Sequence, residues 1–346
     1  MDGSGMTIGI GLVGYGYWGP NLLRNFRSNA DFRVIGVADK KSETRERLSA
    51  AFPDIRTFEE AEMLIAHRDV DAVVIATPVA SHYGIARRAL DTGKHVLVEK
   101  PMCATLDEAR DLVERARRKS LVLMVDHTFL FTGAVQMIKE LVARSALGQV
   151  CYFDSLRVNL GLFQPDVNCL WDLGPHDLSI INHLIDDELI DVEASGYCHV
   201  NQDAPDMVYL TLHFRKNCIA HLNLSWMSPV KIRRFTIGGT DKMLVWDDLD
   251  EDQKIKIYSS GIHFQPEEQR PMIIPQYRIG DIHSPRLRKT EALVGVAQHF
   301  SDVIRGKTPS IMDGTEGLKI VQTLEMAQSR LDDNLKRVRA RRDVPQ

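Results

Sequence analysis

The stretch TIGIGLVGYGYWGP, residues 7–20, joins an apolar run to a glycine-rich turn and decides how the chain begins to fold. Gly14, Gly16 and Gly19 follow that run in the spacing G-x-G-x-x-G. In this context the first glycine permits a tight turn, the second lets a pyrophosphate approach the backbone, and the third lets a helix pack on the strand. Pro20 suits the first turn of that helix. The stretch therefore predicts a strand, a turn and a helix that bind a dinucleotide.

The alternation of apolar runs with helical segments continues to about His127. Five runs are almost entirely apolar, as expected for strands buried on both faces: TIGIGLVG, RVIGVAD, DAVVIATP, HVLVEKP and LVLMVDH. Between them, Thr57/Glu60 and Thr105/Glu108 fit the capping box that begins a helix, and Gly93 suits the position after a helix. The pattern predicts a parallel, doubly wound sheet whose ligands bind at the carboxyl ends of the strands.

After His127 the pattern changes to strands with period-two alternation, such as MVYLTLHF and KIKIYSS. They predict a large, open, mixed but mainly antiparallel sheet, with one face covered by the helices after Asp172. FTIGG (235–239) and MLVW (243–246) suggest that the other face is apolar and forms a subunit interface. Helical periodicity returns at about 291–331, and the basic tail beyond is expected to fray.

We therefore expect an α/β protein of two domains. Residues 6–128 would form a Rossmann domain, and residues 129–335 an α+β domain for substrate binding and assembly into a homodimer or homotetramer.

Composition and charge exclude several classes of protein. A chain with 44% apolar and 26% charged residues is typical of soluble globular proteins. A net charge of −4 gives no overall attraction to nucleic acids or anionic membranes. The five cysteines lack a C-x-x-C pair, which argues against a disulfide framework and a zinc cluster. Because the chain also lacks a membrane-spanning run and a signal peptide, we expect a cytoplasmic protein.

The residue that would contact the adenosine ribose is Asp39, at the end of the second strand. It lies about 20 residues beyond the last glycine, where a carboxylate accepts hydrogen bonds from the ribose and repels a 2′-phosphate. NAD is therefore favoured over NADP. Lys40 and Lys41 would soften that preference.

Two further strand ends are polar, in the segments ATPVASH (76–82) and EKP (99–101). A doubly wound sheet presents such groups to the nicotinamide half of a dinucleotide. Lys100 has two interpretations: it pairs with Glu99 or reaches solvent, or it binds a substrate hydroxyl and stabilises a developing alkoxide.

A carboxylate and an imidazole stand four residues apart in WDLGPHDLSI (171–180). Asp172 could be only an N-terminal helix cap, and His176 only a residue at the helix start, with Gly174 and Pro175 shaping the turn. Alternatively, His176 accepts a proton from a substrate alcohol near neutral pH. A metal site at Asp172, His176, Asp177 and His183 is disfavoured, because hydride transfer to a nicotinamide needs no metal.

With these residues in view, the chain resembles the Gfo/Idh/MocA oxidoreductases over nearly its whole length. The resemblance rests on GYGYWG, ATPVASH, EKP and the D-x-x-x-H pair in this order. HTFLF, RVNLGLFQPDVN, WMSPVKIRR and GDIHSPRL are similar to the branch that contains UDP-N-acetylglucosamine and UDP-N-acetylglucosaminuronate 3-dehydrogenases. Where the family usually has Gly-His-Thr-Phe, this chain has Asp126, an added carboxylate that could alter the choice of substrate.

The resemblance implies an NAD(P)-dependent dehydrogenase that acts on CH–OH groups, and it assigns roles to individual residues. The predicted catalytic residues are Lys100, Asp172 and His176, and which of Lys100 and His176 accepts the proton stays open. Predicted cofactor contacts are Gly14, Gly16, Tyr17, Trp18, Gly19, Asp39, Thr77, Pro78, His82, Glu99, Lys100 and His127. Predicted substrate contacts are Lys100, Arg157, Asn159, Gln164, Asn168, Asp172 and His176, of which Arg157, Asn159, Gln164 and Asn168 could instead cap loops.

Three functions stay open at this point. The first is an NAD-dependent oxidoreductase that acts at C3 of a nucleotide-linked sugar. The second is a cyclitol or free-sugar dehydrogenase, or a ketosugar reductase, because the same groups serve both directions of the reaction. The third is a non-catalytic, dinucleotide-binding regulator, which would have no need of a proton acceptor.

Overall fold

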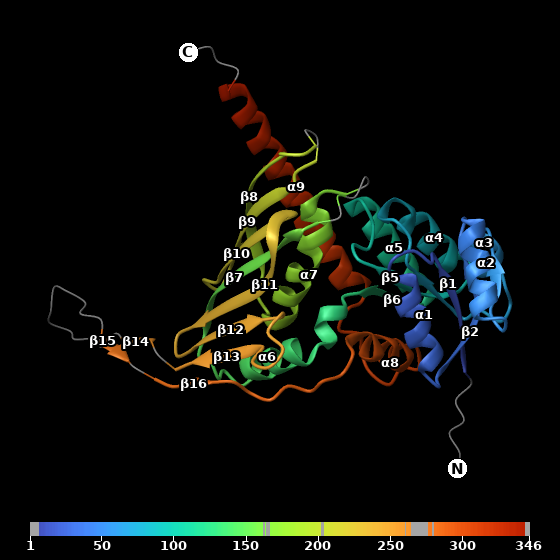
Figure 1. The fold of residues 1–346 in the computed structure, drawn as a ribbon, viewed down its shortest axis with the longest axis horizontal. Coiled ribbons are helices and arrows are strands. Elements are labelled where there is room, and N and C mark those ends of the chain that lie inside the picture. The colour runs from blue at the N-terminus through green and yellow to red at the C-terminus, as the bar shows by residue number, and fades with distance from the viewer. Residues whose placement is uncertain are drawn as a thin grey trace. The chain divides into compact units, whose positions relative to one another are not determined.

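The computed structural model describes residues 7–161, 163, 167–201, 204–259, 261–263, 276–278 and 280–342. The chain divides into two compact units, whose elements are labelled in Figure 1. The first unit is Met1–Thr132 with Thr290–Glu325, and the second is Gly133–Lys289 with Met326–Gln346. Each unit is built around its own sheet.

The first unit contains a six-stranded parallel sheet in the order β3-β2-β1-β4-β5-β6. Its strands are β1 (Ile8–Val13), β2 (Phe32–Ala38), β3 (Arg56–Phe58), β4 (Ala72–Ile75), β5 (His95–Glu99) and β6 (Leu123–Asp126). Every residue of β1, β4 and β6 is buried, as the apolar runs predict. The sequence missed β3, because its three residues are too few to show a periodicity.

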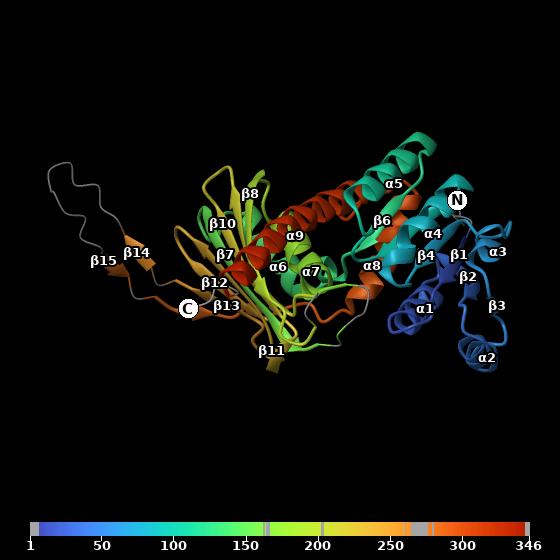
Figure 2. The ribbon, with the colours of Figure 1, turned by 90° about the horizontal axis from the view of Figure 1, so that it is seen from above.

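Helices cover both faces of this sheet (Figure 2). They are α1 (Gly19–Ser28), α2 (Ser42–Ala51), α3 (Ala61–Ile65), α4 (Val79–Asp91), α5 (Leu106–Lys119) and α8 (Ala292–Ile304), with a 3-10 turn, η1 (Thr128–Phe131). The capping box of Thr105 and Glu108 is confirmed at α5, and Gly93, with φ of 80°, follows α4 as predicted. The box predicted for Thr57 and Glu60 is wrong, because Thr57 belongs to β3.

Residues 290–325 pack in the first unit, although the predicted division placed them in the second domain. The Phe300 ring of α8 lies 6.3 Å from Phe26 and 6.2 Å from Phe32, between ring centroids. Met312 O accepts a hydrogen bond from Val125 N at the open edge of β6. Contacts between segments so distant along the chain leave no local signal.

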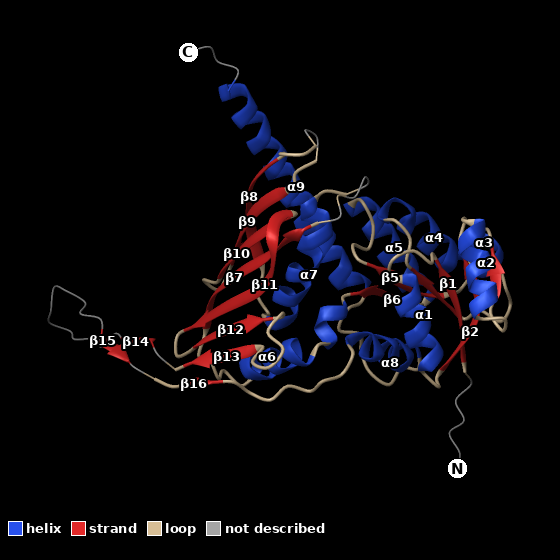
Figure 3. Cartoon of the chain, in the orientation of Figure 1, coloured by secondary structure: helices blue, strands red, loops and turns tan. Residues whose placement is uncertain are grey.

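The second unit contains an eight-stranded sheet in the order β16-β13-β12-β11-β7-β10-β9-β8 (Figure 3). Its strands are β7 (Val150–Leu160), β8 (Leu189–Tyr197), β9 (Met207–Phe214), β10 (Ile219–Ser225), β11 (Met227–Gly239), β12 (Met243–Asp247), β13 (Ile255–Tyr258) and β16 (Ile282–His283). β14 (Gly261–His263) and β15 (Gln276–Arg278) form a separate pair. The sheet is mixed, because β7 and β10 run parallel while its other pairs are antiparallel.

The inner face of the large sheet is covered by α7 (Cys169–Leu184), and α6 (Gly133–Ala143) packs beside α7. Val208, Leu210 and Leu212 point inward from β9, as predicted. The expectation that FTIGG and MLVW form an apolar outer face is wrong: their large side chains are buried, namely Phe235, Ile237, Leu244 and Trp246. The outer face carries polar groups with scattered large side chains, because alternate residues of each strand face opposite sides.

The long helix α9 (Gly314–Arg342) begins in the first unit and ends in the second. It remains helical through the basic tail that was expected to fray. The predicted fold class, a parallel Rossmann sheet followed by a mixed, mainly antiparallel sheet with helices, is confirmed. None of the helices in the described ranges combines the length and apolar character needed to cross a bilayer.

Candidate active site

The glycine-rich turn connects β1 to α1 in the first unit. Gly14 has φ of 91°, and a Cβ there would lie 2.5 Å from Ala76 O. A Cβ on Gly19 would lie 2.7 Å from Gly14 O, whereas one on Gly16 meets nothing within 4 Å. The first and third glycines are thus required by the protein's own backbone, and the second leaves open space where a pyrophosphate can approach. Pro20 lies in the first turn of α1, as predicted.

Asp39 ties the end of β2 to the glycine turn. Its Oδ2 accepts a hydrogen bond from Tyr15 N at 2.8 Å, and Oδ1 accepts one from Lys41 N at 2.9 Å. A carboxylate has about four acceptor positions, so two such bonds leave capacity for ribose hydroxyls. Tyr17 and Trp18 are exposed beside the turn and contact each other edge to face, with ring centroids 5.6 Å apart.

The loop after β4 is held by His82, which is buried in α4. Its Nε2 lies 2.8 Å from Thr77 O and its Nδ1 lies 2.9 Å from Pro101 O. His82 therefore connects the ends of β4 and β5 through backbone carbonyls rather than presenting a free ring. Pro78 is the N-cap residue of α4, and Thr77 Oγ1 accepts a hydrogen bond from Ser81 Oγ at 2.8 Å.

Ionisable groups gather at the ends of β5 and β6, where Glu99 and Asp126 are register partners. Burial raises the pKa of Glu99 to about 8, with a contribution from the Asp126 charge. Burial also raises the pKa of Asp126 to about 6. His127 is buried, and burial together with the Lys100 cation lowers its pKa to about 3. Near pH 7 these pKa values leave Glu99 mostly protonated and His127 neutral, whereas Asp126 is mostly ionised.

The described atoms provide no partner for two buried polar groups of this cluster. They are Asp126 Oδ2 and the His127 imidazole, both of whose nitrogens are buried. Asp126 Oδ1 accepts a hydrogen bond from Thr128 Oγ1 at 2.7 Å. Unsatisfied buried polar atoms are costly in folded proteins and often mark functional sites.

The Asp172/His176 pair lies on α7 of the second unit. The helix begins at Cys169, and Asn168 is its N-cap: Asn168 Oδ1 accepts from Leu170 N at 3.0 Å and Trp171 N at 3.2 Å. Asp172 therefore lies inside the first turn and is not the cap. Gly174 and Pro175 do not form a turn, as one interpretation held, because the helix continues through them. Four residues apart, Asp172 and His176 share one face of α7.

Sequence reasoning missed Trp226, which orients Asp172. The Trp226 indole Nε1 donates a hydrogen bond to Asp172 Oδ2 at 3.1 Å, and Trp226 is itself buried. Gln328 of α9 was missed as well: its Oε1 accepts from Trp171 Nε1 at 3.1 Å and Asn168 Nδ2 at 2.9 Å. These partners are far from residues 168–172 along the chain, so no spacing pattern could have identified them.

The predicted substrate contacts separate into different environments. Asn168 makes the capping contacts that were one of its two interpretations. Arg157 is 4% exposed and forms an ion pair with the buried Asp177, so its guanidinium is engaged inside the unit. Asn159 is half-buried in β7. Gln164 lies outside the described residues.

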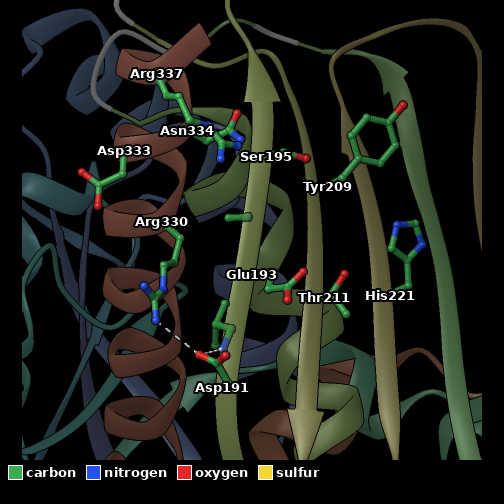
Figure 4. Close-up of a pocket in the computed structure, with 12 residues that line it drawn as sticks. Asp191, Glu193, Ser195, Tyr209, Thr211, His221, Arg330, Asp333, Asn334 and Arg337 are labelled. Atoms are coloured by element: carbon green, nitrogen blue, oxygen red, sulfur yellow. Dashed lines mark hydrogen bonds and ion pairs between the residues drawn. The ribbon is translucent and has the colours of Figure 1, made fainter.

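One hollow of about 600 Å³ lies elsewhere in the second unit, on β8, β9, β10 and α9 (Figure 4). Tyr209 and His221 stack there with ring centroids 6.2 Å apart, and Arg330 pairs with Asp191 at 3.4 Å. It contains none of the predicted site residues. No three His, Cys, Asp or Glu side chains within the described ranges are grouped so as to hold a metal ion.

Two sequence profiles match the chain in succession. Residues 8–127 match the Gfo/Idh/MocA oxidoreductase family, described as having an NAD-binding Rossmann fold, and residues 135–245 match the Gfo/Idh/MocA C-terminal domain. The chain belongs to the Gfo/Idh/MocA family. It is an NAD-binding oxidoreductase, and the prediction of a nicotinamide-dependent dehydrogenase acting on CH–OH groups is confirmed at this level.

Several relatives are similar over much of the chain. UDP-N-acetylglucosamine 3-dehydrogenase from Acidithiobacillus ferrooxidans is 28% identical over 314 residues, which cover 90% of this chain and 93% of that enzyme. Its crystal structure aligns with a TM-score of 0.81 and 25% identity, covering 95% and 99% of the two chains. Scyllo-inositol 2-dehydrogenase (NADP⁺) from Bacillus subtilis is 24% identical over 344 residues, or 93% of each chain. A dTDP-3,4-didehydro-2,6-dideoxy-α-D-glucose 3-reductase from Streptomyces violaceoruber is 32% identical over 179 residues, about half of each chain.

The predicted cofactor, NAD, is confirmed, and the residues present fit it. The open space at Gly16 and the remaining acceptor capacity of Asp39 are the features that a pyrophosphate and a ribose require. Gly14, Gly16 and Gly19 would hold the pyrophosphate, and Asp39 the ribose.

Proposed function

We propose that this protein is an NAD-dependent oxidoreductase that transfers a hydride between the nicotinamide and C3 of a nucleotide-linked sugar, such as a UDP-N-acetylhexosamine or its uronate. The observation that carries the proposal is the similarity to UDP-N-acetylglucosamine 3-dehydrogenase along nine-tenths of the chain in both sequence and structure. Lys100, Asp172 and His176 are the residues we propose for the proton chemistry.

In the proposed reaction, bound NAD supplies the hydride acceptor. His176 or Lys100 takes the proton from the substrate hydroxyl as the C–H bond at the same carbon is broken. Asp172 accepts a hydrogen bond from the Trp226 indole N–H, which orients its carboxyl group on the face of α7 that also carries His176. Reduction of a keto sugar uses the same groups in reverse.

Isotope transfer tests the position of attack. The protein is incubated with NAD and UDP-N-acetylglucosamine that carries deuterium at C3, and the NADH formed is analysed by mass spectrometry. Deuterium in the NADH supports oxidation at C3, whereas unlabelled NADH means attack at another carbon. A parallel series with UDP-N-acetylglucosaminuronate, a dTDP-sugar and scyllo-inositol identifies the preferred substrate.

Two alternatives predict different results in the same series. A cyclitol or free-sugar dehydrogenase, for which scyllo-inositol 2-dehydrogenase is the relevant relative, would reduce NAD with scyllo-inositol and leave UDP-sugars untouched. A non-catalytic regulator would bind NAD without reducing it in a single turnover with any of these compounds. The single-turnover measurement is needed because a tightly held NADH would block steady-state turnover.

We also propose a homodimer or homotetramer assembled through the outer face of the large sheet. Three large side chains are exposed there, Tyr152, Tyr209 and Ile219, and they offer apolar area for a second copy. Light scattering of the wild type and of Ile219→Asp tests this, and a monomeric wild type would contradict it. We also propose a cytoplasmic location, which is supported by the five cysteines, since none of them forms a disulfide in the described structure.

A further inference from the structure

A buried ion pair connects α7 to the sheet beneath it. Arg157 Nε donates to Asp177 Oδ1 at 2.6 Å, and a terminal guanidinium nitrogen lies 2.6 Å from the same oxygen. Ser155 Oγ donates to Asp177 Oδ2 at 2.7 Å. The side chains of Arg157 and Asp177 are 5% and 0% exposed. Both oxygens of the Asp177 carboxylate are therefore held from β7, out of contact with water.

The position of Asp177 in the sequence gives this pair its significance. Asp177 directly follows His176, and successive residues of an α-helix are separated by about 100° around its axis. Fixing Asp177 against β7 therefore fixes the direction in which His176 projects, and with it Asp172 one turn earlier. Buried apolar residues of α7, such as Leu178 and Ile181, make non-directional contacts that by themselves permit small rotations.

The charged residues around the Arg157–Asp177 pair favour this ion pair over other pairings of Arg157. Its cross-strand neighbour is Arg233 of β11, which forms its own ion pair with Asp248 at 3.5 Å. Burial lowers the pKa of Arg233, and the Arg157 cation lowers it further. Asp248 is also paired with Lys254, at 3.6 Å, so Arg157 keeps Asp177 as its partner, and an exchange would break the short contacts there.

We propose that Arg157 is a positioning residue that acts through Asp177 to set the rotation of α7 and the direction of His176, rather than a residue that binds substrate. The inference rests on the proposed function of His176. Replacing a buried ion pair by apolar residues is often neutral for stability, so a pair that served stability alone would be dispensable. A pair that serves position would not be.

The first experiment measures catalysis in a double-mutant cycle. Asp177→Asn should lower kcat by about a hundredfold, the scale expected when a reacting group is misplaced by about 1 Å, with the Kd for NAD within about twofold of wild type. In the His176→Ala background, Asp177→Asn should cause no further loss. Glu188→Gln is the matched control, since it removes one charge from an exposed pair with Arg215 in the same unit. An Asp177→Asn enzyme with wild-type kcat would overturn the inference.

The second experiment separates position from stability. In the double variant Arg157→Met/Asp177→Leu, the melting temperature should be within a few degrees of that of the wild type. Its kcat should still be about a hundredfold below that of the wild type, as in Asp177→Asn. Recovery of kcat with stability would overturn the inference and assign the pair a purely structural role. This variant also keeps the test decisive if Asp177→Asn does not fold.

A third measurement is independent of the substrate. In protein with ¹³C-labelled histidine, the ring signal lost in His176→Ala identifies His176. That signal should shift in Arg157→Met/Asp177→Leu, while the exposed His213 of the outer face stays unchanged. An unshifted signal would overturn the positioning role. If His176→Ala retains full turnover, it is the proposed function of His176 that fails, and the ring signal still reports whether Arg157 sets its direction.

Discussion

The glycine turn after β1 and the helix α7 both present predicted functional residues, but their geometry has different origins. At the turn, Gly14 has a positive φ and Gly19 packs against the carbonyl of Gly14, so a few consecutive residues define the shape. On α7, Asp172 depends on Trp226, and Asp177, next to His176, depends on Arg157. The first region is specified by local backbone constraints, and the second by side chains brought from distant strands.

The difference predicts how each region responds to mutation. A substitution in the glycine turn strains the backbone or fills the space for the pyrophosphate, so it should change the affinity for the cofactor or the stability of the fold. A substitution at a distant partner of α7 changes the direction of the helix side chains, so it should lower turnover while the cofactor still binds.

The largest expected effect lies in the proposed proton chemistry. His176→Ala or Lys100→Ala should each lower kcat by at least about a hundredfold, the usual scale for loss of an acid or base, while the Kd for NAD stays near wild type. Stopped-flow reduction of NAD and calorimetric titration measure the two quantities separately. Unchanged turnover in both variants would remove these residues from the site.

Substitutions in the glycine turn should change cofactor binding or stability, unlike those at His176 and Lys100, which should change kcat. Gly16→Ala places a methyl group in the open space and should weaken NAD binding by about tenfold, with little change in melting temperature. Gly14→Ala is its matched comparison, because strain at a φ of 91° and the approach to Ala76 O should destabilise the fold by about 2–4 kcal/mol. Equal losses of stability in the two variants would contradict the local account.

A smaller effect is expected at Asp39. Asp39→Ala should reduce the preference for NAD over NADP by about tenfold, because repulsion of a 2′-phosphate is lost. Asp39→Asn is the control: it removes the charge but keeps an acceptor for Tyr15 N or Lys41 N, which separates discrimination from support of the turn. Affinities for both cofactors are measured by fluorescence titration. A wild type that binds NADP more tightly would overturn the preference itself.

The smallest effect is a dependence of stability on pH. Glu99 binds its proton up to about pH 8 in the folded protein, against an ordinary pKa of 4.5, so the folded state holds more protons between these values. Its contribution to stability is therefore present below about pH 4.5 and is lost as the pH rises toward 8. Glu99→Gln should gain a few degrees in melting temperature relative to wild type from pH 5 to pH 8. If the melting temperatures of the two proteins change with pH to the same extent, Glu99 ionises near its ordinary pKa and the prediction is wrong.

Several features could be predicted because their causes are local. The apolar runs identified β1, β2, β4, β5 and β6, and the Thr105 capping box needs only residues within one turn of helix. The same kind of reasoning failed where a distant contact competed with a local preference. Thr57 fits a capping box, yet it pairs with Val37 at the sheet edge, and hydrogen bonds between strands take precedence over the cap.

The α7 region shows why part of the candidate site could not be predicted. Gly174 and Pro175 favour a turn locally, but Asn168 begins the helix earlier and buried contacts carry it through the proline. Arginine is a residue type that often binds substrates, so the sequence favoured that role for Arg157. Only the packing of α7 on β7 brings Asp177 to its guanidinium.

The sequence by itself determined five strands of the Rossmann sheet, β1, β2, β4, β5 and β6, and the NAD-binding turn, because glycine conformations and strand periodicity act over a few residues. Only the tertiary structure decided that α7 runs unbroken through Pro175, that Trp226 supports Asp172, and that Arg157 is committed to Asp177. The physical reason is that buried hydrogen bonds and ion pairs depend on which side chains the fold brings within about 3 Å, whatever their separation along the chain.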